Sequence, residues 1–449
     1  MLEKIRAFLI DFVSAVQAVK IYSADHPQPR EMIEKAARNL DAIFREKNEV
    51  VIGIVDNELA WEGEILFDLS QRVHSFLLYL KDRGIERMTF KAPFSSAEFG
   101  RFVAALASPK IKEVDDPQEY WTQIGLQNIK AGKILVKAAA TTPGVKKAEG
   151  LRDHQDRYEA SVGAVSQSVE SMLAEKAISS LDLGFGLLDL LDRFSGKNQK
   201  FLSFVAVKEK DVFTFAHLLN VSILAMHFAS KMGYAKSDVL DVGQAALFHD
   251  IGKVYLSRKV LNKKEALTTE EYSMVRDHSI LGARILLKYK EVLGVLPALA
   301  AFEHHIRYDL RGYPKLSFPC RPHLVSLMIS ICDVYDALTQ KRTYKKDYPP
   351  LQIYTLMTKE KGKLFVPELI DIFFRFMGVW PVGTIVVLND ERIAVVRESN
   401  EQEIFLPKVE VVFPENKRGS VDLAEHKGRL GIKEYLNPFQ EGRRYLDFI

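Results

Sequence analysis

The sequence His249-Asp250-Ile-Gly-Lys253 directly follows an apolar helical stretch, residues 242–248, and decides how the centre of the chain is interpreted. Neighbouring residues of a regular α-helix diverge by about 100° around its axis, so adjacent His and Asp side chains cannot share one face. A helix end at Gly252 would let both side chains converge on a cation. The Asp250 carboxylate could then bridge two cations, with Lys253 within reach of a bound phosphate.

Further nitrogen and oxygen ligands lie on predicted helices on either side of this sequence. Asp333 stands beside the buried stripe of the stretch 327–338, where an isolated charge is costly, so it is expected to be paired or bound to a cation. A lone His on an apolar helix is more often an ordinary core or surface residue, but the set as a whole disfavours that interpretation. The candidate ligands are His217, His249, Asp250, His278, His304, His305 and Asp333.

The residue types in this set indicate the kind of metal. Five of the chain's 11 histidines belong to it, and neither Cys320 nor Cys332 does. Imidazole and carboxylate without thiolate favour Fe, Mn or a similar metal over a structural zinc site. The chemistry that such a set indicates is metal-assisted hydrolysis.

The composition limits the class of protein. A chain of 449 residues is too long for one core, so two to four domains are expected. The net charge of +3 favours neither a nucleic acid polymer nor a membrane as partner. The apolar stretch 293–302 is about half the length of a membrane span. With two cysteines and no signal-peptide pattern, the protein is expected to be cytoplasmic.

Changes in helical and strand periodicity along the chain predict three domains. Residues 1–137 alternate helical and strand signals and are predicted to be an α+β input or regulatory domain; residues 138–152 are small and turn-prone and predict a linker. Residues 153–379 have helical periodicity and predict an all-α domain, and residues 380–449 predict a small β-rich segment.

Individual elements can also be predicted. The N-terminal helices are expected at 2–20, 29–44 and through 99–107, the last with Ser95 or Ser96 as N-cap. Strands are expected at 50–55, 59–66, 88–90, 384–388, 393–396 and 409–413. The stretch around His278, residues 270–288, is predicted as one helical segment.

Ordered motifs over residues 205–350, about a third of the chain, resemble a known family. His249-Asp250-Ile-Gly-Lys253 resembles the hallmark of the HD superfamily of metal-dependent phosphohydrolases. The string His304-His305-Ile-Arg-Tyr-Asp309-Leu-Arg-Gly312-Tyr313-Pro314 resembles that of the HD-GYP subfamily. Residues 211–220, 261–282 and Asp333-Val-Tyr-Asp336-Ala-Leu-Thr-Gln-Lys-Arg342-Thr-Tyr344 add to the similarity.

The resemblance implies an HD-type helical fold and a bacterial phosphodiesterase that converts cyclic di-GMP to linear pGpG, with GMP as a further product. It implies two divalent metal ions, Fe or Mn, on the seven ligands above. It assigns catalysis to Asp250 and Lys253. The implied substrate-binding residues are Lys253, Asp309, Gly312, Tyr313, Pro314, Asp336, Arg342 and Lys345. A solvated charged face is a competing interpretation for Lys345 and its neighbour Lys346.

Three positions depart from the family pattern. Ile306 stands where the family usually has Glu, and Leu310 where it usually has Gly. Phe213 stands where some members carry a Glu that supports a third metal, so two metals are predicted. Every ligand of the two-metal site is present.

Two alternatives remain open beside the phosphodiesterase. Ile306 and Leu310 favour a catalytically weak or inactive domain that binds metal and cyclic dinucleotide and signals through protein partners. The third interpretation, another HD-type nucleotide phosphohydrolase, is disfavoured by the sequence Gly312-Tyr313-Pro314. A homodimer is also left open.

Overall fold

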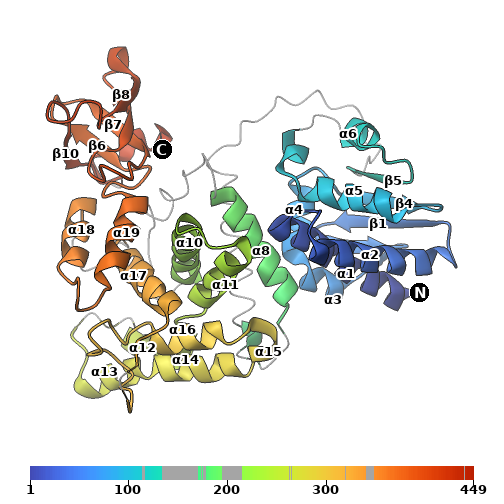
Figure 1. Ribbon diagram of the computed structural model, residues 1–449, viewed down its shortest axis with the longest axis horizontal. Coiled ribbons are helices and arrows are strands. Elements are labelled where there is room, and N and C mark those ends of the chain that lie inside the picture. The colour runs from blue at the N-terminus through green and yellow to red at the C-terminus, as the bar shows by residue number, and fades with distance from the viewer. Residues whose placement is uncertain are drawn as a thin grey trace. The chain divides into compact units, whose positions relative to one another are not determined.

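The computed structural model describes the chain except for residues 114–116, 134–169, 173, 175–177, 195–214, 262, 264, 319, 340–347, 439 and 449. The described residues form two compact units, Met1–Asp189 and Leu190–Ile449 (Figure 1). The predicted linker, residues 138–152, lies outside the described residues. No helix in the described ranges is both long enough and apolar enough to cross a membrane.

The first unit contains a five-stranded antiparallel sheet in the order β3-β2-β1-β4-β5. Its strands are β1 (Glu49–Val55), β2 (Glu58–Trp61), β3 (Glu64–Ile65), β4 (Arg87–Lys91) and β5 (Ile129–Gly132). Its helices are α1 (Leu2–Tyr22), α2 (Pro27–Phe44), α3 (Phe67–Arg72), α4 (His74–Lys81), α5 (Ser96–Ala107), η1 (Pro109–Glu113) and α6 (Pro117–Gln123).

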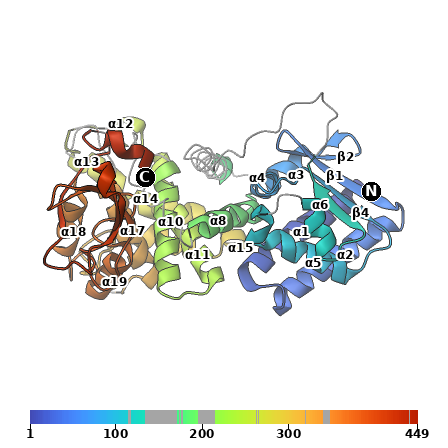
Figure 2. The same ribbon diagram turned by 90° about the horizontal axis from the view of Figure 1, so that it is seen from above.

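Buried aromatic side chains join this sheet to its helices. The ring centroid of Phe90 on β4 lies 5.4 Å from that of Phe8 on α1 and 5.9 Å from that of Phe102 on α5. Helices α1, α2 and α5 pack side by side (Figure 2). Because each buried aromatic ring removes a large apolar area from water, this cluster stabilises the packing of the helices on the sheet.

The predicted α+β character of the N-terminal region is confirmed. Helices 2–20 and 29–44 correspond to α1 and α2, and the hydroxyl of Ser95 accepts a hydrogen bond from the Glu98 amide at 3.1 Å, as expected of an N-cap. Helices α3 and α4 and strand β5 were not predicted. Each has eight residues or fewer, too few for periodicity to identify.

Helix α8 (Ser180–Phe194) begins within the first unit. The ring of Phe185 lies 5.1 Å from that of Phe76 and 4.9 Å from that of Tyr79. A carboxylate oxygen of Asp182 accepts a hydrogen bond from the Ser75 amide at 2.6 Å. The start of α8 therefore packs on the N-terminal unit, whereas the domain limits at residues 137, 152 and 379 stay a prediction.

The second unit begins with a helical domain, as the sequence predicted. Helices α10, α11, α14, α16 and α17 pack on one another and form its centre. Its elements are α10 (Phe215–Lys231), α11 (Lys236–Leu247), η2 (Ile251–Tyr255), α12 (Arg258–Leu261), α13 (Thr269–Arg276), α14 (His278–Leu287), α15 (Lys290–Leu293), α16 (Leu296–Glu303), α17 (Leu324–Thr339), α18 (Pro350–Thr358) and α19 (Pro367–Met377).

The prediction of one helical segment over 270–288 was wrong in detail. Two helices, α13 and α14, divide it, and His278 is the first residue of α14. Helix α13 begins with a capping box in which Thr268 and Glu271 exchange hydrogen bonds. The apolar periodicity continues across the break, which is why the sequence did not reveal it.

A second antiparallel sheet follows the helices, in the order β10-β6-β7-β8-β9. Its strands are β6 (Ile385–Leu388), β7 (Ile393–Glu398), β8 (Lys408–Phe413), β9 (Gly419–Asp422) and β10 (Ile432–Tyr435), with η3 (Glu415–Lys417) and η4 (Arg443–Phe448) beside them. The predicted β-rich C-terminal segment is confirmed. Strands β9 and β10 were missed because both are largely exposed and lack apolar alternation.

Candidate metal centre

The seven predicted metal ligands come together in the helical domain. They are contributed by α10, the turn after α11, the first residue of α14, the end of α16, and α17. One group of ligand atoms belongs to Asp250, His278, His304 and His305, and a second to His217, His249 and Asp333; within each group the ligand atoms lie within 4.8 Å of one another. Either group could therefore hold a metal ion.

The Asp250 carboxylate lies between the two groups. Its Oδ1 atom is 3.2 Å from Nε2 of His278 and 3.6 Å from Nε2 of His304. Its Oδ2 atom is 3.6 Å from Nε2 of His249 and 3.8 Å from Nε2 of His217. One oxygen therefore faces each group, which is the arrangement of a bridging carboxylate.

Backbone carbonyls fix the orientation of three of the imidazoles. The Nδ1 atoms of His249, His278 and His304 each donate to the carbonyl three residues earlier, at 2.7, 2.5 and 3.0 Å. A carbonyl can only accept, so the proton of each neutral ring is on Nδ1. Each Nε2 lone pair is left facing the Asp250 side, as expected of metal-bound histidines.

His217 is oriented by a buried side chain instead of a carbonyl. Its Nδ1 atom lies 2.7 Å from Oδ2 of Asp336, and the other oxygen of Asp336 accepts a hydrogen bond from the Asn220 amide at 3.0 Å. Asp336 is fully buried. The sequence assigned Asp336 to substrate binding, but its two oxygens are engaged behind His217, so its position is that of a positioning residue.

The two carboxylates of the centre are ionised. Burial opposes the charge of Asp250, but Lys253 and the histidines hold its pKa well below the usual range. Burial likewise opposes the charge of Asp333, but the neighbouring His217 and His249 lower its pKa well below the usual range. Ionised oxygens are ligands that hard divalent cations prefer.

The histidines differ in protonation. Burial lowers the pKa of His304 to about 4 and that of His305 well below the ordinary value, so both are neutral and able to bind a cation. Burial also lowers the pKa of His217, but Asp333 and Asp336 outweigh it and raise that pKa to about 10. A cation bound at His217 must therefore displace a proton.

Two buried atoms test whether the residues present fit a metal. Nε2 of His249 and Oδ1 of Asp250 are inaccessible to solvent, and neither has a hydrogen-bond partner within the described residues. A buried polar atom without a partner costs about 1–3 kcal/mol. Cations between the two groups would satisfy both atoms, so the residues fit a divalent metal.

The helix break that frees His249 and Asp250 comes earlier than predicted. Helix α11 ends at Leu247, before both ligands, and not at Gly252. Gly252 has a different role: a Cβ atom there would lie 1.9 Å from the backbone oxygen of His278. Only glycine allows η2 to approach α14 this closely, which brings Asp250 and His278 together.

The segment Gly312-Tyr313-Pro314 packs directly on His305. The amides of Gly312 and Tyr313 donate to the carbonyls of Ile306 and His305, at 2.9 and 3.0 Å. A Cβ atom at Gly312 would lie 1.9 Å from the His305 oxygen, and the ring of Tyr313 lies 4.7 Å from that of His305. The segment therefore packs against the His305 side of the centre.

Asp309, predicted to bind substrate, is engaged within its own loop. Its carboxylate accepts two hydrogen bonds from the Arg307 guanidinium, at 2.9 and 3.0 Å, and one from the Arg311 amide. Leu310 has a positive φ of 59°, and Ile306 is buried in the core. The departures from the family pattern thus lie in the backbone turn and in the core, not among the ligands.

Three positions of the sequence analysis lie outside the described residues: Phe213, Arg342 and Lys345. Lys253 is described, and its ammonium group pairs with Oδ2 of Asp250. Lys253 thus lies at the centre, and its contact with a phosphate stays a prediction.

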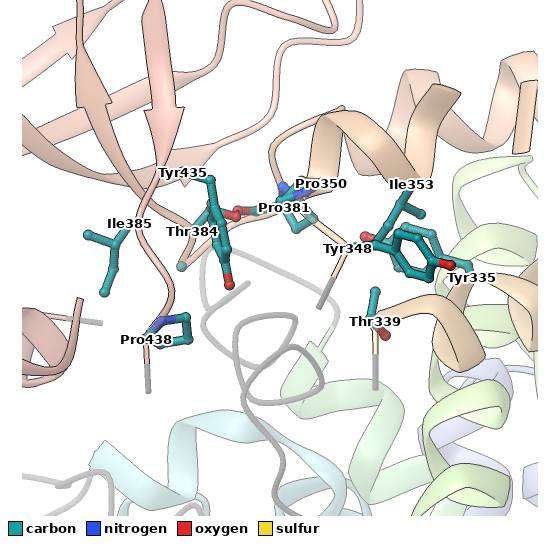
Figure 3. Close-up of a pocket in the computed structure, with 11 residues that line it drawn as sticks. Tyr335, Thr339, Tyr348, Pro350, Ile353, Pro381, Thr384, Ile385, Tyr435 and Pro438 are labelled. Carbon is teal, nitrogen blue, oxygen red and sulfur yellow. The ribbon is translucent and has the colours of Figure 1, made fainter. Parts of the chain in front are cut away.

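A separate pocket opens between the helices and the C-terminal sheet (Figure 3). It is lined by Tyr335, Thr339, Tyr348, Pro350, Ile353, Pro381, Gly383, Thr384, Ile385, Tyr435 and Pro438. None of these side chains is charged. The pocket therefore offers no charged side chain to an anionic ligand.

Comparison with known proteins agrees with this geometry. A family model described as an HD domain matches residues 189–369. A cyclic di-GMP phosphodiesterase of Pseudomonas aeruginosa is 34% identical over 229 residues, which are 50% of this chain and 55% of that protein. Over its helical domain the chain is therefore similar to HD-domain cyclic di-GMP phosphodiesterases.

Two further relatives of the chain differ from each other in the substrate that their names give. A cyclic di-GMP phosphodiesterase of Thermotoga maritima is 31% identical over 166 residues, 37% of this chain and 45% of that protein. A 3'3'-cGAMP-specific phosphodiesterase of Vibrio cholerae is 30% identical over 167 residues, 37% of this chain and 32% of that protein. The chain spans about half or less of the length of the relatives that it matches.

Proposed function

We propose that this protein is a metal-dependent phosphodiesterase that hydrolyses cyclic di-GMP to linear pGpG, with GMP as a further product, in bacterial second-messenger signalling. The observation that carries the proposal is the bridging position of Asp250. Its two oxygens face two ligand groups, and every ligand of both groups is present. The names of relatives in Pseudomonas aeruginosa and Thermotoga maritima supply the substrate.

The proposed cofactor is a pair of divalent metal ions, Fe or Mn. The first would be held by Asp250, His278, His304 and His305, and the second by Asp250, His217, His249 and Asp333. The donor set is imidazole and carboxylate, which suits these metals, and contains no thiolate. A metal pair of this kind supplies a nucleophile from water near neutral pH and polarises a phosphoryl oxygen.

The residues of the chain would orient the reaction. Asp336 holds the His217 ring, and backbone carbonyls hold three others, so the centre changes little when substrate binds. Lys253, whose ammonium group lies at Asp250, would neutralise charge that develops on the phosphate oxygens. Tyr313, whose ring lies 4.7 Å from that of His305, would help to hold His305 in place. Arg342 and Lys345 are proposed as further phosphate contacts.

A binding module is the second candidate function, and the observation that favours it is the loop at Leu310. A leucine with positive φ stiffens a turn where the family usually has glycine. Such a domain would bind metal and cyclic dinucleotide and act through protein partners or as a homodimer. Under either function, residues 1–137 are proposed to receive the regulatory signal.

Chromatography of a reaction mixture distinguishes the two functions. Anaerobic protein loaded with Fe(II) or Mn(II) is expected to convert cyclic di-GMP to pGpG, and Asp250→Ala is expected to abolish the conversion. Intact substrate with a fully metal-loaded centre would favour the binding module. Preferential cleavage of mononucleotides would instead support another HD-type nucleotide phosphohydrolase.

A further inference from the structure

A row of neighbouring side chains leads from the metal centre to an exposed tyrosine. The Tyr313 ring lies 4.7 Å from the ring of the proposed ligand His305. The guanidinium carbon of Arg276 lies 5.3 Å from the centroid of Tyr313 and 5.9 Å from that of Tyr272. Tyr272 is 51% exposed. The row thus ends on an aromatic face that is open to a ligand.

Arg276 contributes to the fold through contacts with aromatic rings and not through an ion pair or a side-chain hydrogen bond within the described residues. Within the described residues, its guanidinium makes no ion pair and donates no hydrogen bond; its contacts are with the two rings. Asp277 follows it directly but is not within ion-pairing distance. The guanidinium has five N–H donors in a planar fork, and here they are available to a ligand.

The cyclic dinucleotide proposed to bind at the metal centre is the ligand that the N–H groups of Arg276 would contact. We propose that Arg276 and Tyr272 form a purine subsite that takes one guanine base of the cyclic dinucleotide. This inference rests on the proposed function, because a phosphodiester held at the metal centre places its nucleoside beside the centre. Tyr272 offers a face for base stacking, which is commonly worth about tenfold or more in affinity.

The N–H donors of Arg276 make the subsite selective for guanine. Guanine presents two acceptors, O6 and N7, that match a guanidinium fork. Adenine presents N7 together with the N6 amino donor, which opposes the N–H groups of Arg276. A contact from Arg276 to the second phosphate is the competing assignment, and it would not discriminate between the two bases.

Base selectivity therefore tests the proposal. The kcat/KM for cyclic di-GMP and cyclic di-AMP would be measured for the parent, Arg276→Gln and Arg284→Gln. Arg284 is an exposed arginine on α14 and serves as the matched control. Arg276→Gln is expected to lower the preference for cyclic di-GMP about tenfold or more, while Arg284→Gln keeps the parent ratio. Metal content is expected to equal that of the parent.

Two substitutions of Tyr272 test the other residue of the subsite. Tyr272→Ser is expected to weaken both dinucleotides, and Tyr272→Phe to restore them, because stacking needs the ring and not the hydroxyl. An equal loss of both substrates in Arg276→Gln would assign Arg276 to a phosphate and overturn the purine subsite. An unchanged ratio and unchanged kcat/KM would also overturn it.

Failure of the proposed function gives a different result. If the parent hydrolyses neither dinucleotide, the phosphodiesterase proposal is refuted. The subsite is then decided by equilibrium binding of cyclic di-GMP and cyclic di-AMP to the metal-loaded parent and to Arg276→Gln. A guanine preference that disappears in the variant supports the subsite, and equal binding by both proteins contradicts it.

Discussion

The Nδ1 atom of His217 lies 2.7 Å from Oδ2 of Asp336, a fully buried carboxylate one helical turn after the candidate ligand Asp333. Helix α17 thus supplies one side chain to the second ligand group and another that orients a histidine of the same group. The other oxygen of Asp336 is bound by Asn220, one turn after His217 on α10. Contacts between α10 and α17 therefore fix the orientation of His217.

Asp336→Asn is expected to weaken metal binding in the group of His217, His249 and Asp333. The substitution keeps the size of the side chain but removes the charge that orients His217. Loss of such a supporting carboxylate typically costs about 10–100-fold in metal affinity. Metal titration of the apoprotein measures the change, with Asp390→Asn on the C-terminal sheet as control. Equal affinity in Asp336→Asn and the parent would contradict the positioning role.

Gly252→Ala is expected to destabilise the helical domain by about 2 kcal/mol or more. The added Cβ would lie 1.9 Å from the His278 oxygen, so η2 and α14 must separate. Chemical denaturation of the apoprotein measures the loss. Gly431→Ala is the control, because a Cβ there meets no atom within 4 Å. Equal stability of the two variants would refute the close approach.

Leu310→Gly is expected to be more stable than Leu310→Ala by about 1 kcal/mol. Both variants remove the side chain, but only glycine adopts the φ of 59° without steric cost. The order is expected to reverse at the exposed helical residue Leu287, where alanine is favoured over glycine by about 0.5–1 kcal/mol. Thermal unfolding of the four variants measures both differences. The same order at both positions would show that the turn carries no strain.

His227 is expected to make the fold sensitive to acid. Burial, followed by the charge of Lys231, lowers its pKa to about 4, and its Nε2 atom has no partner within the described residues. Between the folded pKa and the ordinary value near 6.5, the unfolded chain binds more protons. Stability is therefore full above pH 6.5 and is lost as the pH falls toward 4, by up to about 3 kcal/mol.

His227→Leu removes this titration. The free energy of unfolding of the metal-free protein, measured at pH 7 and pH 4.5, is expected to fall less in the variant than in the parent. His323→Leu, at an exposed histidine, is the control. An equal fall in His227→Leu and the parent would mean that His227 is not the acid-sensitive group.

The sequence predicted which residues meet at the centre, but it did not predict the backbone structure that brings them together. The order and residue types of the seven ligands predicted a metal centre, and the structure brings the seven side chains together in two groups. The helix break before His249 and the division of residues 270–288 into two helices were missed, since neither changes the apolar periodicity. The position of Asp336 behind His217 depends on a contact over 119 residues, which a single sequence does not reveal.

Titration of the apoprotein with Fe(II) or Mn(II), followed by an assay of cyclic di-GMP hydrolysis at each step, tests the central assignment most directly. The bridging position of Asp250 predicts that turnover rises to a plateau at two equivalents of bound metal and yields linear pGpG. A protein that binds two equivalents and leaves cyclic di-GMP intact would contradict it.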